Sequence, residues 1–281
     1  MVIFKRIDDL QKFIKKKKEN GRSVGFFPTM GALHDGHLSL LEKAEVETDV
    51  TVCSIFVNPT QFNDPNDFDK YPVSIEQDIY LLETHGCDVL FLPDATEIYP
   101  DGQELGEPYQ LGTVEHVLEG AFRPGHFQGV CQVVNRLLDI VQPDELFMGQ
   151  KDYQQIMVVQ KMVEEKHIAV QMVIVPTKRA ENGLALSSRN ARLSKTGTDK
   201  ALVLSRALSY IKNNIAKADF RILEENATRE ILDNGFSKVD YVSIRNANDL
   251  SEVDQYTRGV PLVVLTAAYI DGVRLIDNML L

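Results

Sequence analysis

The chain has 281 residues, of which 44% are apolar and 25% charged, proportions typical of a globular protein that buries a core without disulfides. Its 30 basic and 41 acidic side chains give a net charge of −11, and a field of that sign disfavours nucleic acid as a partner. No apolar run is long enough for a membrane span, the charged start MVIFKRIDDL is unlike a secretion signal, and three widely spaced cysteines suit a reducing compartment, so we expect a cytoplasmic protein.

The first half of the chain alternates short apolar runs with helical periodicity. The runs are β-branched or aromatic and predict buried strands at Ser23–Pro28, Val50–Val57, Cys87–Pro93, Glu145–Met148 and Ile168–Val175. Helices are expected at Leu38–Glu47, Ile75–His85, Val130–Val141 and Tyr153–Glu165. This alternation predicts an α/β fold with a Rossmann-like parallel sheet and helices on both faces, in which ligands bind beyond the carboxyl ends of the strands.

The second half has a different pattern. A polar, glycine-containing segment over Pro176–Leu193 is followed by helical periodicity at Lys200–Ile215 and Phe220–Asn234. Strands are then expected at Lys238–Ile244, Leu262–Tyr269 and Val273–Ile276, with Asp271-Gly272 as a hairpin turn. We therefore predict two domains, 1–176 and a smaller α+β domain over 177–281. The lysine run Lys15–Lys18 is interpreted as the solvated last turn of a first helix.

The segment FFPTMGALHDGHLSLL is the most informative in the chain. A buried strand ends at Pro28, and a glycine-containing loop brings His34 and His37 to the start of an amphipathic helix. A helix start favours an anion, and two imidazoles can donate hydrogen bonds to phosphate oxygens. A zinc site is the weaker interpretation, because no third histidine or cysteine follows at a suitable spacing.

Polar residues also follow the other predicted strands. Asn58 and Gln61 of FVNPTQF carry amides suited to a hydroxylated carboxylate, although a plain polar turn fits as well. Lys151 of GQKD can place a charge on phosphate, and Asp152 can bind ribose hydroxyls or cap the next helix. Arg123 and His126 of FRPGHF could equally border a pocket or stabilise a loop, whereas motif-free histidines are expected on the surface: His85, His116 and His167.

Five segments, in this order, resemble those of the pantothenate synthetase (pantoate–β-alanine ligase) family within the HxGH nucleotidyl-transfer superfamily: PTMGALHDGHLSL, FVNPTQF, FRPGHFQGV, FMGQKDYQQ and GLALSSRN. The resemblance spans residues 23 to about 193. It implies an ATP-dependent condensation of (R)-pantoate with β-alanine through a pantoyl adenylate, releasing AMP and pyrophosphate. It also implies Mg²⁺ carried by the ATP phosphates, with no protein ligand that we can name, a homodimer formed through the first domain, and a second domain that closes over ATP.

The resemblance assigns residues to each substrate. It gives Gln61 and Gln155 to pantoate, and we expect Asn58 to bind pantoate or β-alanine with them. It also makes His37, His34 and Lys151 catalytic through charge stabilisation. Ser187, Ser188 and Arg189 match a mobile second signature that closes over the triphosphate. The residues expected to bind ATP are Met30, Gly31, Ala32, Leu33, His34, Asp35, Gly36, His37, Gly149, Gln150, Lys151, Asp152, Lys178, Leu186, Ser187, Ser188 and Arg189.

Three other functions fit the sequence less well. A nucleotidylyltransferase that keeps its adenylylated product shares HxGH but does not explain FVNPTQF together with KDYQQ. A tRNA synthetase is disfavoured by the acidic charge and the lack of an RNA-binding region. A silent nucleotide-binding regulator could share the fold, but the complete set of His34, His37, Lys151, Ser187 and Arg189 argues against it.

Overall fold

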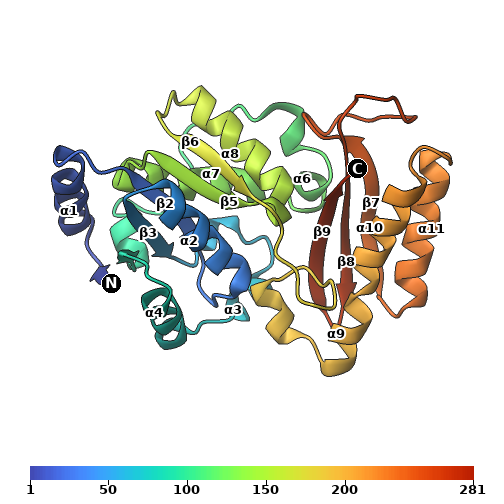
Figure 1. Ribbon diagram of the computed structural model, residues 1–281, viewed down its shortest axis with the longest axis horizontal. Coiled ribbons are helices and arrows are strands. Elements are labelled where there is room, and N and C mark those ends of the chain that lie inside the picture. Colours follow the sequence, from blue (N-terminus) through green and yellow to red (C-terminus); the bar gives the residue numbers. More distant parts are fainter.

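The computed structural model describes all 281 residues and contains two sheets. The larger sheet has six parallel strands in the order β1-β4-β3-β2-β5-β6 (Figure 1). Its strands are β1 (Val2–Phe4), β2 (Val24–Thr29), β3 (Val50–Ile55), β4 (Val89–Phe91), β5 (Glu145–Gly149) and β6 (Gln171–Val175). The chain runs outward from β2 in one direction through β3 and β4 and in the other through β5 and β6. The junction of β2 and β5 is therefore the point where such sheets bind ligands.

Helices cover both faces of this sheet, as the alternation of elements predicted. On one face α1 (Ile7–Glu19), α7 (His126–Val141) and α8 (Tyr153–Glu165) pack in a core that contains Phe26 of β2. On the other face α2 (Asp35–Glu47) and α4 (Ile75–Thr84) pack around the next residue, Phe27. Both phenylalanines are fully buried. Strand β2 is therefore apolar on both faces, which explains its uninterrupted run of apolar residues in the sequence. The Rossmann-like class is thus confirmed.

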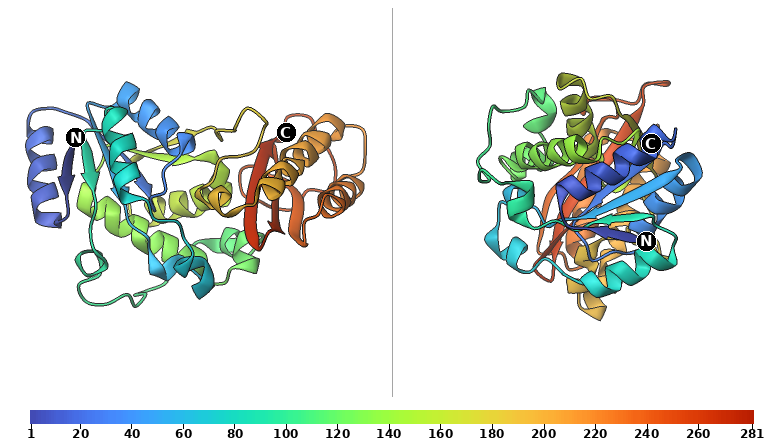
Figure 2. Two further views of the ribbon diagram at one scale, coloured as in Figure 1. Left: turned by 90° about the horizontal axis from the view of Figure 1, so that it is seen from below. Right: turned by 90° about the vertical axis from the view of Figure 1, so that its left-hand side faces the viewer.

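The smaller sheet is antiparallel and has the order β7-β8-β9. Its strands are β7 (Lys238–Asn246), β8 (Leu262–Ile270) and β9 (Val273–Leu280), and α9 (Lys195–Ala201), α10 (Val203–Asn214) and α11 (Phe220–Asp233) precede them. Helices α10 and α11 cover one face, whose core contains Val264. The neighbouring Val263 and Leu265 pack instead into the core of the larger unit, by which we mean the six-stranded sheet with its helices. The other face of this sheet is therefore turned toward the larger unit (Figure 2).

The predicted hairpin turn is confirmed. Ile270 pairs with Val273, and the two residues between them, Asp271 and Gly272, have φ of 51° and 71°. Positive φ at both central positions is the geometry that matches the twist of a hairpin, and it favours the Asp-Gly pair. Strand β9 continues to Leu280, beyond the expected end at Ile276, because it pairs with β8 along its whole length.

Several predicted boundaries were wrong for local reasons. Helix α2 begins at Asp35, not Leu38, because the His34 side chain caps it. Strand β6 begins at Gln171, not Ile168, because the Ile168 N–H still donates to the Val163 carbonyl at the end of α8. Similarly, β4 starts at Val89 rather than Cys87, because the Cys87 N–H donates to the Leu82 carbonyl at the end of α4. Strand β3 ends at Ile55 rather than Val57. Helix α7 starts at His126 rather than Val130, directly after Gly125, whose backbone is in the left-handed region.

Other elements were not predicted at all. The edge strand β1 was missed, and the helix expected over Lys200–Ile215 is two helices that start earlier, where the Ser194 hydroxyl caps α9. Short elements also connect the larger ones: η1 (Pro59–Gln61), α3 (Pro65–Asp69), α5 (Ala95–Ile98), η2 (Gly112–Glu115), α6 (Glu119–Phe122), η3 (Gln150–Asp152) and η4 (Ser188–Arg192). None of the helices is both long and apolar enough to cross a membrane.

Candidate active site

A large cavity lies where the carboxyl ends of β2 and β5 face the smaller sheet. It is lined by groups from all five segments singled out in the sequence and by strands β7 to β9. Most of the expected site residues line it: Met30, His34, Gly36, His37, Asn58, Gln61, Gly149, Lys151, Asp152, Gln155, Lys178, Leu186, Ser187, Ser188 and Arg189. The remaining expected residues do not line it, namely Gly31, Ala32, Leu33, Asp35 and Gln150.

The two histidines of the HxGH turn are held in a fixed tautomer. The Gly36 N–H donates to His34 Nδ1 at 3.1 Å, and the His34 N–H donates to His37 Nδ1 at 3.3 Å. A backbone N–H can only donate, so both Nδ1 atoms are unprotonated and each neutral ring carries its proton on Nε2. The rings lie 4.1 Å apart between centroids. The pair therefore offers two neutral Nε2–H donors rather than two cations.

Burial and a nearby cation keep these imidazoles uncharged. Burial, followed by the positive charge of Lys151, lowers the pKa of His34 to about 4. Burial, His34 and Lys151 likewise hold the pKa of His37 well below its usual value. Both effects disfavour the protonated ring, since a charge loses hydration and meets another positive charge. The positive charge at this edge of the cavity is thus carried by Lys151.

The loop before the histidines is anchored by a carboxylate that the sequence did not reveal. Asp78 of α4 is fully buried and accepts the N–H groups of Ala32 and Leu33 at 2.9 and 2.8 Å. Gly31 and Ala32 both have positive φ, which turns the loop back onto α4. These two N–H groups are therefore occupied within the protein, which explains why this part of the predicted ATP loop lies outside the cavity lining.

Lys151 is positioned by the second unit. The Asn278 side chain of β9, itself buried, donates to the carbonyls of Gln150 and Lys151 at 3.0 and 2.8 Å. The Gln150 side chain also donates to Asn278 Oδ1 at 3.4 Å, so it faces β9 rather than the cavity. Asp152 occupies the N-cap position of α8 but makes no capping hydrogen bond, so that predicted role was wrong. Its carboxylate lies 3.6 Å from Lys151 Nζ instead.

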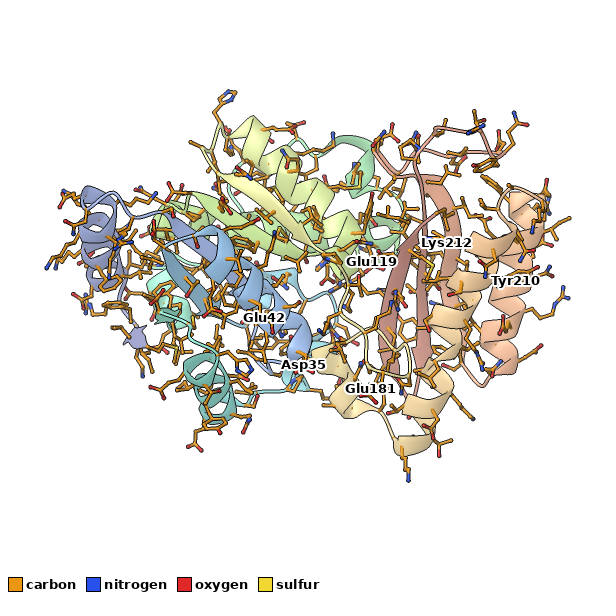
Figure 3. All side chains as sticks on the ribbon, viewed as in Figure 1. Asp35, Glu42, Glu119, Glu181, Tyr210 and Lys212 are labelled. Carbon is orange, nitrogen blue, oxygen red and sulfur yellow. The ribbon has the colours of Figure 1, made fainter.

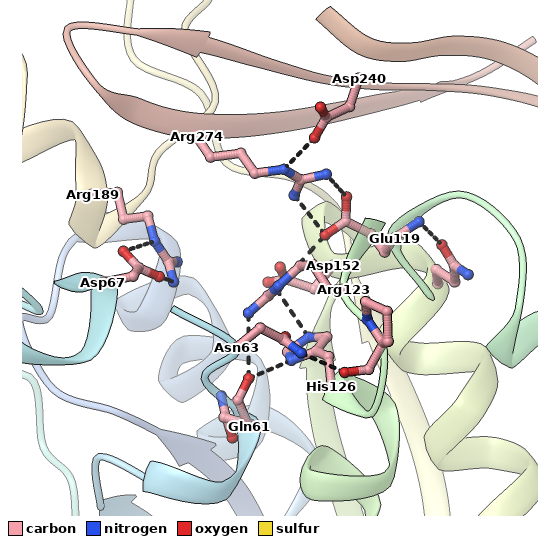
Figure 4. Close-up of polar contacts among 12 residues, drawn as sticks. Gln61, Asn63, Asp67, Glu119, Arg123, His126, Asp152, Arg189, Asp240 and Arg274 are labelled. Carbon is pink, nitrogen blue, oxygen red and sulfur yellow. Dashed lines mark hydrogen bonds and ion pairs between the residues drawn. The ribbon is translucent and has the colours of Figure 1, made fainter. Parts of the chain in front are cut away.

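The polar segment of the linker packs against the first loop. The Ser188 hydroxyl donates to the Ala32 carbonyl at 3.1 Å, and Ser187 caps the short helix η4. Arg189 is bound to Asp67 of α3 at 2.7 Å (Figure 4). Its guanidinium also lies over the ring of Tyr71. The Lys178 carbonyl accepts the Leu186 N–H, which closes the base of this segment.

The amide side chains form another part of the lining. Asn58 is 1% exposed, and its carboxamide bonds only to protein: Nδ2 donates to Gly129 O and Gln61 Oε1, and Oδ1 accepts from Thr60 and Tyr99. An amide has two donors and two acceptor sites, so its capacity is fully used. Gln61 and Gln155 both line the cavity, and Gln61 is the one that Asn58 holds.

Arg123 and His126 fill both roles that the sequence left open, bordering a pocket and stabilising a loop. They line the cavity, and they also support the Gln61 loop. His126 Nδ1 lies 2.7 Å from the Gln61 carbonyl, which can only accept, and Nε2 lies 3.0 Å from Arg123 Nη1, which can only donate. The ring must therefore be neutral, and burial together with Arg123 lowers the pKa of His126 to about 3. The other three histidines are exposed at helix ends, as expected: His85, His116 and His167.

A buried ionic network, which we call the Glu119 clasp, joins the two units beside these residues. Glu119 of α6 accepts two hydrogen bonds from Arg274 of β9, at 2.8 and 2.6 Å, and one from Tyr241 of β7 at 2.6 Å. Arg274 Nε also binds Asp240 at 2.8 Å. Although burial alone raises the pKa of Glu119, the Arg274 guanidinium lowers it to about 2. Figures 3 and 4 show Glu119 at the junction of the units; no sequence signal pointed to it.

Comparisons with known proteins agree with this geometry. The family model described as Pantoate-beta-alanine ligase matches residues 2–280. A pantothenate synthetase of Cytophaga hutchinsonii is 41% identical over 283 residues, covering 100% of this chain and 99% of that protein.

Solved structures lead to the same family. A crystal structure of pantothenate synthetase from Thermus thermophilus superposes with a TM-score of 0.90 at 38% identity, covering 99% of both chains. The pantoate-beta-alanine ligase of Francisella tularensis, solved with beta-gamma ATP and beta-alanine, has a TM-score of 0.84 at 38% identity, covering 100% of this chain and 97% of that one. The match extends over both sheets and the linker between them. The chain therefore belongs to the pantoate-beta-alanine ligase family of enzymes.

Proposed function

We propose that the chain condenses (R)-pantoate with β-alanine at the expense of ATP, through a pantoyl-adenylate intermediate. The observation that carries the proposal is the convergence of His34, His37 and Lys151 with the amides of Gln61 and Gln155 in one cavity. Donors for phosphate oxygens thus lie beside donors and acceptors for a hydroxylated acid. The Francisella tularensis relative, solved with ATP and β-alanine ligands, supports the same substrates.

The first step joins pantoate to AMP. A carboxylate oxygen of pantoate attacks the α-phosphorus of ATP, the bond to the β-phosphate oxygen breaks, and pyrophosphate leaves. Little covalent chemistry falls to the protein, since this transfer needs mainly alignment and charge stabilisation. His34 and His37 donate from Nε2, and Lys151 supplies a positive charge to the same phosphates. Gln61 and Gln155 hold the attacking acid in line.

The second step forms the amide bond. The β-alanine amine attacks the activated carbonyl, AMP leaves with the former carboxylate oxygen, and the amine proton is released. The adenylate is needed because a free carboxylate has a poor leaving group. No enzyme nucleophile is required, consistent with three cysteines that are all buried away from the cavity lining.

The nucleotide is assigned to the other expected residues of the cavity. We propose that Gly149 and Asp152 bind the ribose, Lys178 the adenine through its backbone, and Ser187, Ser188 and Arg189 the triphosphate. Arg189 would exchange Asp67 for phosphate oxygens. No group of three or more His, Cys, Asp or Glu side chains is placed to hold a metal. We assign Mg²⁺ to the ATP phosphates and name no protein ligand for it.

Pyrophosphate exchange tests the two-step scheme. With ATP, pantoate and Mg²⁺ but no β-alanine, labelled pyrophosphate should be incorporated into ATP, because the first step is reversible and complete in itself. Omission of pantoate should abolish the exchange. Exchange that required β-alanine would contradict a separate adenylate, and absence of pantothenate with all three substrates present would contradict the function.

Three further proposals come from the family resemblance. We propose a cytoplasmic homodimer formed through residues 1–176, and a unit over 177–281 that closes on ATP. The Asn278 contacts to Gln150 and Lys151 support the last point, because they couple the smaller sheet to the phosphate-binding turn. Small-angle scattering with and without a non-hydrolysable ATP analogue measures both mass and closure.

A further inference from the structure

Tyr99 lies outside the cavity lining, yet it is connected to the amides that line it. It follows helix α5 and is 9% exposed, with its ring 6.1 Å from that of Phe56. Its hydroxyl donates to Asn58 Oδ1 at 2.9 Å. A buried tyrosine hydroxyl usually has a partner, but here the partner is the carboxamide that holds Gln61.

Two backbone groups act together with the Tyr99 hydroxyl to orient the Asn58 amide. The Thr60 N–H, which can only donate, lies 3.4 Å from Oδ1, and the Gly129 carbonyl, which can only accept, lies 3.1 Å from Nδ2. Gly129 permits this approach, because a Cβ on it would clash with the Thr60 carbonyl oxygen. The amide nitrogen of Asn58 must therefore face Gln61.

This orientation determines which end of Gln61 is free. Asn58 Nδ2 donates to Gln61 Oε1 at 3.2 Å, so the Gln61 oxygen is directed to Asn58 and its nitrogen lies away from it, 3.1 Å from the sulfur of Met30. A thioether sulfur is a weak acceptor. An oxygen of a bound acid is a stronger one, so Gln61 can exchange Met30 for substrate without turning over.

We propose that Tyr99 is a positioning residue that acts through Asn58, so that Gln61 presents N–H donors to the oxygens of the acid substrate. The relay runs in one direction, from the Tyr99 hydroxyl to Asn58 Oδ1 and from Asn58 Nδ2 to Gln61 Oε1. Burial raises the pKa of Tyr99 to about 12, so the phenol remains a donor at any working pH. This inference rests on the proposed use of pantoate and adds a residue that helps to orient it.

The test compares Tyr99→Phe with Tyr109→Phe in the full-length enzyme. Both tyrosines are 9% exposed in the same core, but Tyr109 bonds to no amide of the cavity. Removal of one hydrogen bond of about 1 kcal/mol should raise KM for pantoate about 5-fold in Tyr99→Phe. The KM for ATP should stay within about 2-fold, kcat should change little, and Tyr109→Phe should leave all three values near wild type.

Asn58→Asp gives an independent reading. The carboxylate cannot donate to Gln61, so Gln61 must turn its nitrogen inward and present its oxygen to the acid. Pantoate KM should then rise far more than ATP KM. Equal changes in both KM values, or equal effects of the two tyrosine variants, would overturn the inference. Wild-type enzyme that makes no pantothenate would overturn the proposed function instead.

Discussion

The two sides of the cavity are built in different ways. On the side of the six-stranded sheet, His34 and His37 lie where the loop after β2 enters α2, and Lys151 lies in the turn after β5. Each is held by backbone atoms within a few residues or by one side chain from β9. On the opposite side, the Glu119 clasp joins groups 155 residues apart through buried charges. The first arrangement leaves donors free for a ligand, whereas in the second each charge already has a protein partner.

This difference separates chemistry from cohesion. A free donor costs little to remove from the folded protein but is needed in the transition state. A buried ion pair contributes modestly as a pair, but removal of one partner leaves the other charge buried and uncompensated. Substitutions on the sheet side should therefore lower turnover with stability unchanged, and substitutions in the clasp should lower stability first.

The largest effect is expected in the clasp. Glu119→Gln removes the charge that Arg274 and Arg123 face, and should lower the free energy of unfolding by about 3–5 kcal/mol. Urea denaturation followed by circular dichroism measures it. Glu225→Gln is the matched control, since its partner Arg221 is exposed and that pair lies on the surface of α11; it should cost at most about 0.5 kcal/mol. Equal losses in the two variants would show that the clasp is not buried as described.

Lys151→Ala tests the sheet side. Its ammonium is the positive charge beside two neutral histidines, so its removal should lower kcat by about 10²–10³-fold, as for other groups that stabilise transition-state charge. The midpoint of urea unfolding should stay near wild type. Lys161→Ala, further along the chain in α8 and outside the cavity lining, should leave kcat unchanged. Activity retained in Lys151→Ala would remove this lysine from the reacting phosphates.

The same division explains what could be predicted from the sequence. Strand ends and helix starts are local, so His34, Lys151 and the Asp271-Gly272 turn could be found from short segments. No short segment indicates that Asp78 occupies the N–H groups of Ala32 and Leu33, because these contacts join residues 46 and 45 positions apart.

The clasp could not be found for a related reason. Glu119 and Arg274 are ordinary charged residues in their own segments, and only the docking of the smaller sheet brings them together. Asn58 shows a third case: its type and place were predicted, but its amide serves Gln61 and Tyr99 rather than standing free. Side chains that hold other side chains carry no local signature.

The smallest effect concerns how stability depends on pH. It sharpens the comparison because His126 both lines the cavity and supports the Gln61 loop through buried hydrogen bonds. Its pKa lies near 3 when folded and near 6.5 when unfolded. Between these values the unfolded chain binds more protons, so stability is complete above pH 6.5 and is lost as the pH falls toward 3. The low pKa values of His34 and His37 act in the same direction.

We therefore expect thermal stability to decline between about pH 7 and pH 5, above the range in which Glu119 itself becomes protonated. His126→Asn keeps a neutral donor and acceptor at this position but cannot be protonated. It should therefore reduce the loss of unfolding free energy over this pH range by on the order of 1–2 kcal/mol. His85→Asn, at an exposed helix end, should leave the decline unchanged. Tm measured by calorimetry across this range decides the matter. A decline as steep in His126→Asn as in wild type would mean that His126 is protonated in the fold, which its hydrogen bonds to Arg123 and the Gln61 carbonyl do not allow.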